Sequence, residues 1–464
     1  KEVVALWVCT QCQKTIPANA KPLCDCGGEA RLKEIRGSTP ASRFLVLELA
    51  ERLPFEPRIL GYLRLDPPIP RMHRRTPEGA ERDIRERIFP RDWFHPTYEG
   101  GADWQKALDR VNTAAARIAR VVVHPDYRSE GFGALLVRVA LEWAKERGAP
   151  EARREKHLVY TIAQMARYHP FFEKVGFRYL FDTASGRPVL FYPLTEEAEA
   201  HLERFLREDP YAKAHGGRLY KPRFGRVPGL PGPIRLAGVH KAYRSHLDLE
   251  GLSRAVQEAL LAFGVQARVV ERAVLRGASL EIPPGSLVVL AGASGAGKTT
   301  LLRLLLGEAP DAGEVAVPPG RRVAYIPGER EVDLGEAPIL EAVYRRLKDV
   351  GAAIEVLNRV GLSDAVLYRA RPHELSTGQR ERFRLALLLA ERPDLLLIDE
   401  FAAHLDVPTA RRVALGLGKL CREAGVTLVA ATHRPEVVAA LDPDLLVYVG
   451  YGGLTTVPRR GPRT

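Results

Sequence analysis

The stretch that decides the fold of the C-terminal half is SLVVLAGASGAGKTTLLRLLLG, residues 286–307. It begins with an apolar run typical of a buried strand and ends with the apolar spacing of a helix. Between them lies GASGAGKT, residues 292–299, a glycine-rich loop whose backbone N–H groups can surround phosphate oxygens at a helix N-terminus. The stretch therefore predicts a strand, a phosphate-binding loop and a helix in succession.

The loop predicts a site for ATP and Mg²⁺. We expect Lys298 to reach the β- and γ-phosphates and Thr299 to ligate Mg²⁺. Downstream, PDLLLIDE (393–400) is an apolar strand that ends in two carboxylates, which suits Asp399 for the Mg²⁺ shell and Glu400 for polarising the attacking water. The residues expected to bind the nucleotide in this half are Gly292, Ser294, Gly295, Gly297, Lys298, Thr299, Thr300 and Asp399.

Between these two motifs, LSTGQ at residues 375–379 resembles the LSGGQ signature of the ABC ATPases. The resemblance covers roughly residues 234–450 and includes AHLD at 403–406 as the D-loop. It implies that His433, in LVAATHRPE, is the switch histidine and acts with Glu400 in catalysis.

The resemblance also has a consequence for assembly. In ABC ATPases the signature of one subunit closes over the ATP of another, so Ser376 and Gly378 would contact a nucleotide bound to Lys298 of a second copy. One signature and one phosphate loop per chain then imply a homodimer with two ATP molecules at a two-fold interface.

Two features depart from the family pattern. After the strand in VAYIPGERE (323–331) the chain has Gly328 and Glu329 where the family has a glutamine. Tyr243, our candidate for stacking on adenine, is about thirty residues from the next strand, which is more than usual. No transmembrane partner is encoded and no coiled coil is inserted, which argues against a transporter subunit and against a chromosome-structure ATPase.

The N-terminal half contains a second phosphate-binding pattern. A β-branched strand at 120–123 is followed by RSEGFG at 128–133 and by an amphipathic helix, which resembles motif A of the GNAT acetyltransferases. The resemblance implies a site for acetyl-CoA, with its pantetheine along the strand and its pyrophosphate on the loop amides. The residues implied are Val121, Val123, Arg128, Gly131 and Gly133.

Further along, FFEKVGF at 171–177 is similar to the GNAT ending FYEKLGF and implies a mixed sheet that splays apart to hold the pantetheine. The tyrosine that protonates the departing thiolate is replaced by Phe172. We expect Tyr168 to take that role, with Tyr160 and His169 as the alternatives, although core packing would explain any of the three.

The acceptor amine must lose a proton as it attacks the thioester. We expect His124, at the end of the strand, to serve as the base, with His95 and Glu99 as alternatives. The segment 70–99 combines clustered arginines with aromatic residues, which suits either contact with a nucleic acid or a solvated charged surface. The arginines to test there are Arg71, Arg74 and Arg75.

Two cysteine pairs near the N-terminus have the spacing of a small zinc ribbon. They are Cys9 and Cys12, then Cys24 and Cys26. Four thiolates complete the tetrahedral coordination of Zn²⁺ and stabilise a segment too short to fold alone. We therefore expect a structural zinc ion rather than redox-active or unliganded thiols.

The sequence as a whole predicts a multidomain α/β protein. The expected parts are a zinc ribbon at 1–36, a GNAT domain with an α+β mixed sheet at 37–212, a Pro/Gly-rich basic linker at 213–233 and an ABC nucleotide-binding domain at 234–464. Charges interrupt every apolar run, and no leader is evident, so we expect a cytoplasmic protein without membrane segments.

The net charge is +12, and the basic excess lies mainly in residues 1–230, which favours a polyanionic partner there. The leading hypothesis is an ATP-dependent N-acetyltransferase that acts on tRNA or DNA. RVVVHPDYRSEGFG (120–133) looks like part of the tRNA cytidine acetyltransferases, which also join an ATPase to a GNAT domain. The alternatives are a protein or small-amine acetyltransferase regulated by ATP, and a non-catalytic acyl-CoA sensor on an ABC switch.

Overall fold

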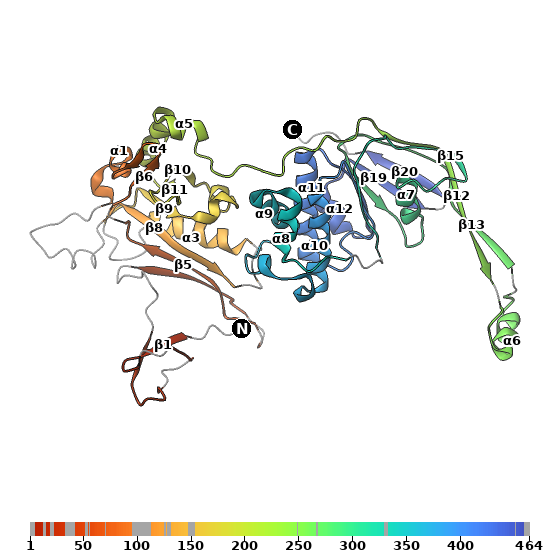
Figure 1. Ribbon diagram of the computed structural model, residues 1–464, viewed down its shortest axis with the longest axis horizontal. Helices are drawn as coiled ribbons and strands as arrows, with labels where there is room; N and C mark the ends of the chain where they lie inside the picture. The colour runs from red at the N-terminus through yellow and green to blue at the C-terminus, as the bar shows by residue number, and fades with distance from the viewer. Residues whose placement is uncertain are drawn as a thin grey trace, which may run out of the picture. The chain divides into compact units, whose positions relative to one another are not determined.

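The computed structural model (Figure 1) describes residues 5–12, 15–18, 23–32, 42–51, 54, 56–69, 71–94, 113–124, 127, 131–146, 154–247, 249–265, 268–328, 333–450 and 452–458. The chain divides into two compact units, Lys1–Tyr220 and Lys221–Thr464. Each unit has its own sheets and its own buried apolar clusters.

Unit 1 begins with a small antiparallel sheet in the order β2 (Thr15–Ala18), β1 (Ala5–Cys9) and β3 (Ala30–Leu32). Cys9 ends the central strand, and the turn after it brings Cys12 back toward the strand. So small a sheet buries little apolar surface, so it needs another source of stability.

The main sheet of unit 1 has six strands. Their order is β10 (Arg178–Asp182), β11 (Pro188–Pro193), β9 (Leu158–Ile162), β8 (Ala115–Val123), β5 (Ile59–Asp66) and β4 (Arg43–Glu48). Only the central pair β8 and β9 is parallel, and α3 (Phe132–Glu146) lies between them in the chain. Parallel neighbours require such a crossover.

Helices cover both faces of this sheet. The apolar side of α3 packs on one face together with Leu63 and Val159. The other face packs on α1 (Ile84–Ile88), α4 (Glu196–Glu208) and α5 (Pro210–His215). A short hairpin, β6 (Arg74–Thr76) and β7 (Gly79–Glu81), precedes α1.

The parallel pair separates partway along its length. Register pairing between β8 and β9 runs from Ala115 with Leu158 to Ile118 with Thr161. Beyond Ile118 the strand β8 continues to Val123 while still pairing with β5 on its other edge. At residues 119–122 the edge of β8 that does not pair with β9 therefore faces an opening in the sheet.

Unit 2 contains a parallel sheet and an antiparallel sheet. The first has the order β16 (Val323–Ile326), β17 (Leu395–Ile398), β18 (Thr427–Ala431), β14 (Leu287–Ala291), β19 (Leu445–Gly450) and β20 (Gly453–Pro458), with only β20 antiparallel. The second has the order β13 (Arg268–Ile282), β12 (Ile234–Leu247) and β15 (Ala312–Ala316).

Helix α7 (Lys298–Leu305) shares one apolar cluster with both sheets of unit 2, so it lies between them. The other helices gather in a second cluster on the far side of the parallel sheet. These helices are α8 (Ile339–Leu347), α9 (Val350–Arg359), α10 (Thr377–Ala390), α11 (Val407–Ala424) and α12 (Pro435–Leu441).

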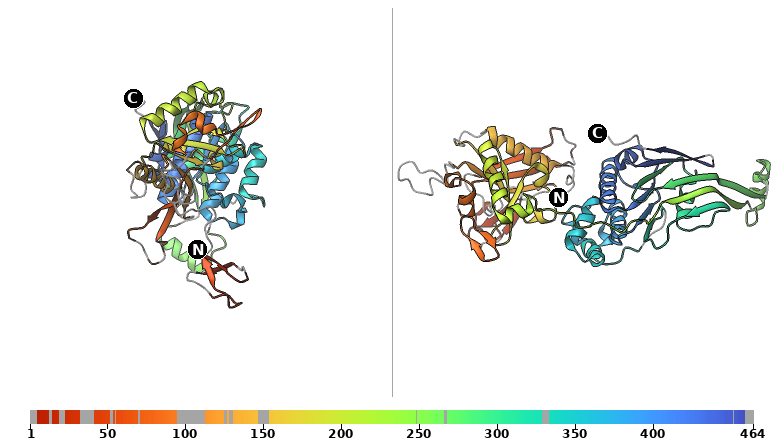
Figure 2. Two further views of the ribbon diagram at one scale, coloured as in Figure 1. Left: turned by 90° about the vertical axis from the view of Figure 1, so that its left-hand side faces the viewer. Right: turned by 90° about the horizontal axis from the view of Figure 1, so that it is seen from above.

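The hairpin formed by β12 and β13 extends far beyond the sheet. Pairing continues out to Leu247 with Arg268, and α6 (Arg254–Ala262) lies at the tip. Figure 1 and the right-hand view of Figure 2 show this arm projecting from the rest of its unit. The arm accounts for the long interval after Tyr243 that the sequence displays.

Residues 221–233, expected as part of a linker, lie against the ATPase core. Phe224, Val227 and Leu230 are buried there. The buried carboxylate of Glu355 accepts hydrogen bonds from the backbone N–H groups of Arg223 and Phe224, at 2.7 and 3.1 Å. This strap has no helical or strand period because it runs irregularly and inserts apolar residues singly.

A second carboxylate holds the chain just before the strap, within unit 1. Glu173 accepts hydrogen bonds from the N–H groups of Leu219 and Tyr220, the first at 2.7 Å. Burial raises the pKa of Glu173, and those two N–H groups oppose the rise. Lys221 and Pro222 therefore remain between the two clamped segments.

Among the helices that the structure describes, none combines the length and the apolar character that crossing a lipid bilayer requires.

Candidate functional site

The phosphate loop connects the buried strand β14 to α7, as the sequence predicts. Two of its glycines are required by their surroundings. A Cβ atom at Gly292 would lie 2.2 Å from the carbonyl oxygen of Val449, and one at Gly297 would lie 2.6 Å from a methyl of Val274. Both also have positive φ angles, +146° and +111°. The loop can therefore fold so tightly only with glycine at these positions.

The charged residues of this site are already engaged with one another or with the loop. Lys298 Nζ donates hydrogen bonds to the carbonyls of Gly292 and Ala293, both at 2.8 Å. The Thr299 hydroxyl donates to an oxygen of Asp399 at 2.7 Å. A hydroxyl and a carboxylate side by side at the start of a helix suit an octahedral Mg²⁺ that also binds phosphate. The geometry thus fits a Mg²⁺–nucleotide complex.

A cavity of about 320 Å³ opens beside these groups. Burial lowers the pKa of Lys298, while Asp399 and Glu400 oppose that shift. Glu400 itself has a positive φ of 50°, and its N–H donates to Asp399. The residues that line the cavity are Tyr243, Arg272, Val274, Ser294, Gly295, Gly297, Lys298, Thr299, Thr300, Asp399 and Glu400.

Arg272 and Val274 line the cavity although nothing in the sequence indicates them. Tyr243, our candidate for stacking on adenine, lines the cavity as well. The Tyr243 hydroxyl donates to Glu308 at 3.2 Å, and Lys241 lies 5.7 Å from the centre of the ring. Arg272 gave no signal in the sequence because its strand partner is nearly thirty residues earlier.

The signature residues lie outside this cavity. Ser376 is exposed and caps α10, where its hydroxyl accepts a hydrogen bond from the N–H of Gln379. A Cβ atom at Gly378 would lie 3.0 Å from Leu405 of the D-loop. The N-terminus of α10 is thus exposed beside the D-loop and outside the nucleotide cavity of its own chain.

The switch segment is joined to the D-loop. His433 is exposed just after β18. Its neighbour Arg434 donates to the carbonyls of Ala402 and Leu405, both in the segment after Glu400. Arg434 therefore joins the segment after β18 to the stretch between Glu400 and the end of the D-loop.

At the departure from the family pattern, Gly328 lies directly against Glu400. A Cβ atom at Gly328 would be 3.1 Å from the carboxylate carbon and from one carboxylate oxygen of Glu400. Glu329 lies outside the described residues. A longer side chain at 328 would therefore compete with Glu400 for space.

The opening in the unit 1 sheet forms a cavity of about 410 Å³. Gly131, with a φ of +89°, and Gly133 lie at the start of α3, whose N-terminus faces this end of the sheet. Arg128 lies outside the described residues. The cavity is lined by Ile118, Ala119, Arg120, Val121, Val123, Gly133, Thr161, Ile162, Ala163, Gln164, Met165, Phe171 and Phe172.

This cavity fits the pantetheine arm of an acyl-CoA. Its walls are mostly apolar, and it follows the edge of β8 at residues 119–122, beyond the pairing with β9, where backbone N–H and C=O groups can bond to an amide-bearing chain. Close packing explains why Gly133 is small, because a Cβ there would lie 3.0 Å from the ring of Phe171.

The residues nominated for proton transfer do not line the cavity. Tyr168 follows a short helical turn, and His124 directly follows β8, where its N–H donates to the carbonyl of Leu60. Tyr160 is fully buried on the other face, where its hydroxyl accepts a hydrogen bond from the N–H of Ile69 at 2.8 Å. Burial lowers the pKa of His169 to about 4, so its ring is neutral near pH 7.

Phe172 does line the cavity, at the position where the family has its tyrosine. The ring is buried and packs edge-on against Phe171 and Phe177. His95 and Glu99, the alternative bases, lie outside the described residues. Among the described residues, the acid position is therefore occupied by a ring that cannot donate a proton.

One of the arginines expected to contact an acceptor has a structural role instead. Arg74 is buried and forms ion pairs with Glu81 at 2.8 Å and with Asp209 at 2.9 Å. The sequence suggested a surface residue because Asp209 is distant in the chain. Arg71 and Arg75 are exposed and stay available for an acceptor.

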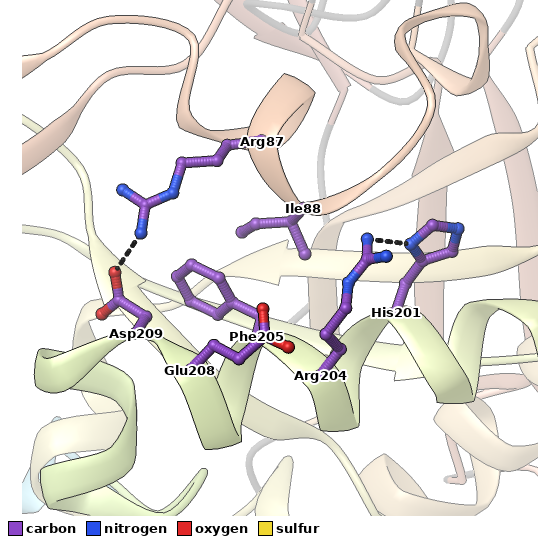
Figure 3. Close-up of a pocket in the computed structure, with 7 residues that line it drawn as sticks. All are labelled: Arg87, Ile88, His201, Arg204, Phe205, Glu208 and Asp209. Carbon is purple, nitrogen blue, oxygen red and sulfur yellow. Dashed lines mark hydrogen bonds and ion pairs between the residues drawn. The ribbon is translucent and has the colours of Figure 1, made fainter.

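Asp209 also borders a small hollow of about 230 Å³ between α1 and α4 (Figure 3). Arg87 Nη2 forms an ion pair with Asp209 Oδ2 at 3.0 Å, and Arg204 Nη2 is hydrogen-bonded to His201 Nδ1 at 2.9 Å. Burial alone would raise the pKa of Asp209, but the N–H of Ala212 and the paired guanidinium groups lower it. The ion pair between Arg87 and Asp209 at this hollow therefore links α1 to the junction of α4 and α5.

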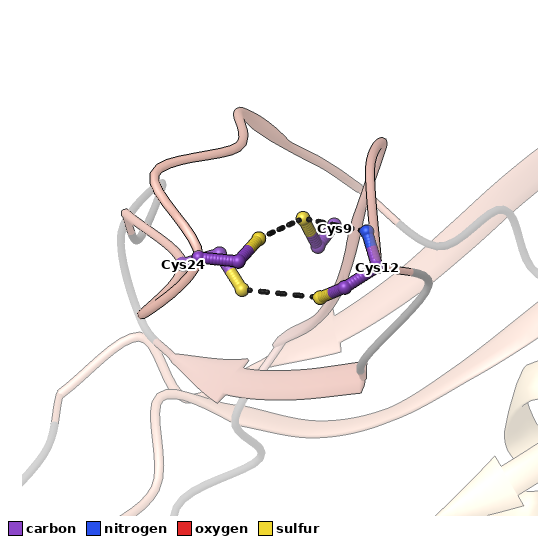
Figure 4. A group of neighbouring side chains, drawn as sticks. Cys9, Cys12 and Cys24 are labelled. Atoms are coloured by element: carbon purple, nitrogen blue, oxygen red, sulfur yellow. Dashed lines mark hydrogen bonds between the residues drawn. The ribbon is translucent and has the colours of Figure 1, made fainter.

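The four N-terminal cysteines converge at one point (Figure 4). All four Sγ atoms lie within 4.8 Å of one another, with Cys9 to Cys26 and Cys12 to Cys24 both at 3.4 Å. The N–H groups of Cys12 and Gln11 point at the Cys9 sulfur and lower the pKa of that thiol to about 6, against the effect of burial. This donor set fits tetrahedral Zn²⁺ with thiolate ligands.

We expect the purified protein to contain one zinc ion per chain. Changing both Cys9 and Cys24 to Ser should remove it, because two thiolates cannot hold the metal tightly, and residues 5–32 should then become protease-sensitive. Metal content by mass spectrometry measures the first effect and limited proteolysis the second. Cys421→Ser is the matched control, since that thiol is buried elsewhere and its loss should leave the zinc in place. Equal zinc in both variants would contradict the assignment.

Comparison with known proteins agrees with this geometry. A family model described as "ABC transporter" matches residues 275–403, and one described as "Acetyltransferase (GNAT) domain" matches residues 99–179. The fold and site define unit 2 as a P-loop ATPase of the ATP-binding cassette class. The chain belongs to the ABC ATPase family, and it carries a GNAT domain in addition. The predicted fold class and both resemblances are confirmed.

Curated relatives match the ATPase region. The zinc import ATP-binding protein ZnuC of Ruegeria pomeroyi is 34% identical over 198 residues, which are 41% of this chain and 75% of that protein. The lipoprotein-releasing system ATP-binding protein LolD 1 of Rhodospirillum rubrum is 35% identical, over 36% of this chain and 84% of its own length.

The chain spans a smaller share of other relatives. It covers 57% of the methionine import ATP-binding protein MetN of Mesorhizobium japonicum, at 34% identity over 40% of this chain. Among solved structures, the dimeric bacterial ABC transporter cassette MJ0796 is similar, with a TM-score of 0.37 and 22% identity, over 49% of this chain and 100% of that one.

Proposed function

We propose that the protein is an ATP-dependent N-acetyltransferase that modifies a nucleic acid, with an ABC homodimer controlling how the substrate is loaded or released. The observation that carries the proposal is the presence in one chain of two formed cavities, one beside Lys298 and one along the free edge of β8. The basic excess of residues 1–230 and the exposed Arg71 and Arg75 support a polyanionic acceptor.

In the ATPase unit, the chain's own groups supply the chemistry of hydrolysis. Lys298 would exchange its two loop carbonyls for phosphate oxygens, and Thr299 and Asp399 would hold Mg²⁺. Glu400 would orient the attacking water and accept its proton, and the ABC resemblance adds His433 as the switch histidine. Ser376 and Gly378 of a second copy close the site, so two chains share two ATP molecules.

In the GNAT unit, the amides at Gly131 and Gly133 hold the pyrophosphate and the edge of β8 holds the pantetheine of acetyl-CoA. The acceptor amine attacks the thioester carbonyl, the C–S bond breaks, and the acetyl group becomes an amide. The amine gives up one proton to water, and the coenzyme departs as a thiolate that takes a proton from solvent, because neither His124 nor Tyr168 lines the cavity.

A second function is favoured by one observation. Phe172 occupies the acid position in the cavity and cannot protonate the departing thiolate. A GNAT fold that binds acyl-CoA without turnover would act as a sensor for the ABC switch. The import activities of the relatives do not carry over to the acyl-CoA site, because the alignments with them span about two fifths of this chain.

Transfer of label from radioactive acetyl-CoA to total tRNA, genomic DNA or protein, with and without ATP, tests the proposal. We expect label in nucleic acid that requires ATP and is lost in Lys298→Ala. Label confined to protein would show that the acceptor is a protein and not a nucleic acid. Acetyl-CoA binding without any transfer would favour the sensor function. The matched control is Lys419→Ala, which removes an exposed lysine far from the phosphate loop in sequence.

A further inference from the structure

Arg272 lies at the root of the projecting arm, directly opposite Tyr243 in the β12–β13 register. Both residues line the nucleotide cavity. The next pair outward, Arg244 with Glu271, is joined by an exposed ion pair at 3.0 Å. The cavity is therefore lined by both members of one register pair of the hairpin, next to this ion pair.

The guanidinium of Arg272 is turned toward the phosphate loop. Its Nη2 donates a hydrogen bond to the carbonyl of Gly295 at 2.9 Å, and a Cβ atom at Gly295 would lie 3.2 Å from the same nitrogen. Among the ion pairs of the described residues, none involves Arg272. Its guanidinium is hydrogen-bonded to a neutral carbonyl and is not paired with a carboxylate among the described residues.

Lys298 has the same arrangement on the same loop, with its ammonium on the carbonyls of Gly292 and Ala293. Two cations thus hold neutral carbonyls of one short loop. Hydrogen bonds between ionised partners are stronger than those to a neutral carbonyl, so both cations gain by exchanging these carbonyls for phosphate oxygens. A planar guanidinium can in addition hold two oxygens of one phosphate at once.

The contacts of Arg272 indicate which phosphate of the nucleotide it would bind. Tyr243, on which a base can stack, and Lys298, Thr299 and Asp399, which suit the terminal phosphates and Mg²⁺, line the same cavity as Arg272. Arg272 is the register partner of Tyr243 and contacts Gly295, three residues before Lys298, so it is connected to both groups.

We propose that Arg272 binds the α-phosphate of the nucleotide and so ties the root of the arm to the occupied site. The inference rests on the proposed ATP site and adds a recognition residue to it. Because ATP and ADP share the α-phosphate, the contact strengthens both to the same degree. Adenosine, which has no phosphate, gains nothing from it.

The test compares dissociation constants for ATP, ADP and adenosine, measured by calorimetry on the full chain. We expect Arg272→Ala to weaken ATP and ADP binding about ten- to a hundredfold, by equal factors, and to leave adenosine unchanged. Arg272→Lys should fall between, since it keeps the charge but loses the two-point contact. Arg244→Ala is the matched control, one register position away and exposed, and should bind like the unmodified chain.

Three results would overturn the inference. One is a change of less than about twofold for ATP in Arg272→Ala while the unmodified chain binds ATP. Another is weaker binding of ATP but not of ADP in Arg272→Ala, which would place the contact on the γ-phosphate. The third is an equally large loss of ATP and ADP affinity in Arg244→Ala. Failure of the unmodified chain to bind ATP would instead remove the proposed function, which separates the two cases.

Discussion

Changing Glu400 to Gln should leave ATP bound and slow its hydrolysis at least about a hundredfold, the usual scale for loss of a general base. The amide cannot take a proton from the attacking water. The groups expected to hold Mg²⁺ and the phosphates, Thr299, Asp399 and Lys298, are untouched. ATP should then accumulate in the closed state, and the chain should elute as a dimer.

Phosphate release and size-exclusion chromatography with ATP and Mg²⁺ measure these two effects. Glu281→Gln is the matched control, because that carboxylate is exposed and pairs only with Arg235 among the described residues. We expect it to hydrolyse ATP normally and to show no accumulated dimer. A Glu400→Gln chain that stays monomeric with ATP would contradict a nucleotide sandwich between two copies.

Changing Phe172 to Tyr should raise the rate of acetyl transfer roughly ten- to a hundredfold. The substitution adds a hydroxyl to the wall of the acyl-CoA cavity at the position where the family has its proton donor. General acid catalysis is commonly worth about a hundredfold or more, and a new donor without tuned surroundings should recover part of that. The KM for acetyl-CoA should change little, because the ring keeps its packing.

The measurement is release of the coenzyme thiol in the presence of the acceptor that labelling identifies. Phe171→Tyr is the matched control, since that ring also lines the cavity and lies 4.8 Å from Phe172. Equal rates in both variants, or no gain in either, would show that the side chain at 172 does not face the departing sulfur.

The sequence was sufficient to predict those parts of the sites that residues close together in the chain form. The phosphate loop, with Lys298 and Thr299, is a local motif whose geometry follows from its glycines and from the helix that begins there. Asp399 was predictable because a buried parallel strand must deliver its last residue to the same edge of the sheet. The opening beside β8 followed from the resemblance to GNAT proteins.

The sequence was insufficient to predict contacts between residues that are far apart in the chain. Arg74 looked like a surface cation, yet it is neutralised by Asp209, 135 positions later. Arg272 meets Tyr243 only because an arm of unforeseen length pairs in register. Phe224 looked like part of a linker because a single apolar residue in an irregular segment has no period to detect.

The two carboxylates fix the length of the connection between the units. Glu173 holds Tyr220 within the first unit and Glu355 holds Arg223 within the second, so three peptide steps separate the held residues. Pro222 removes one of the few backbone rotations of this connection. Its reach of roughly 11 Å is therefore an upper limit on the distance between the two held residues, whatever the arrangement of the units.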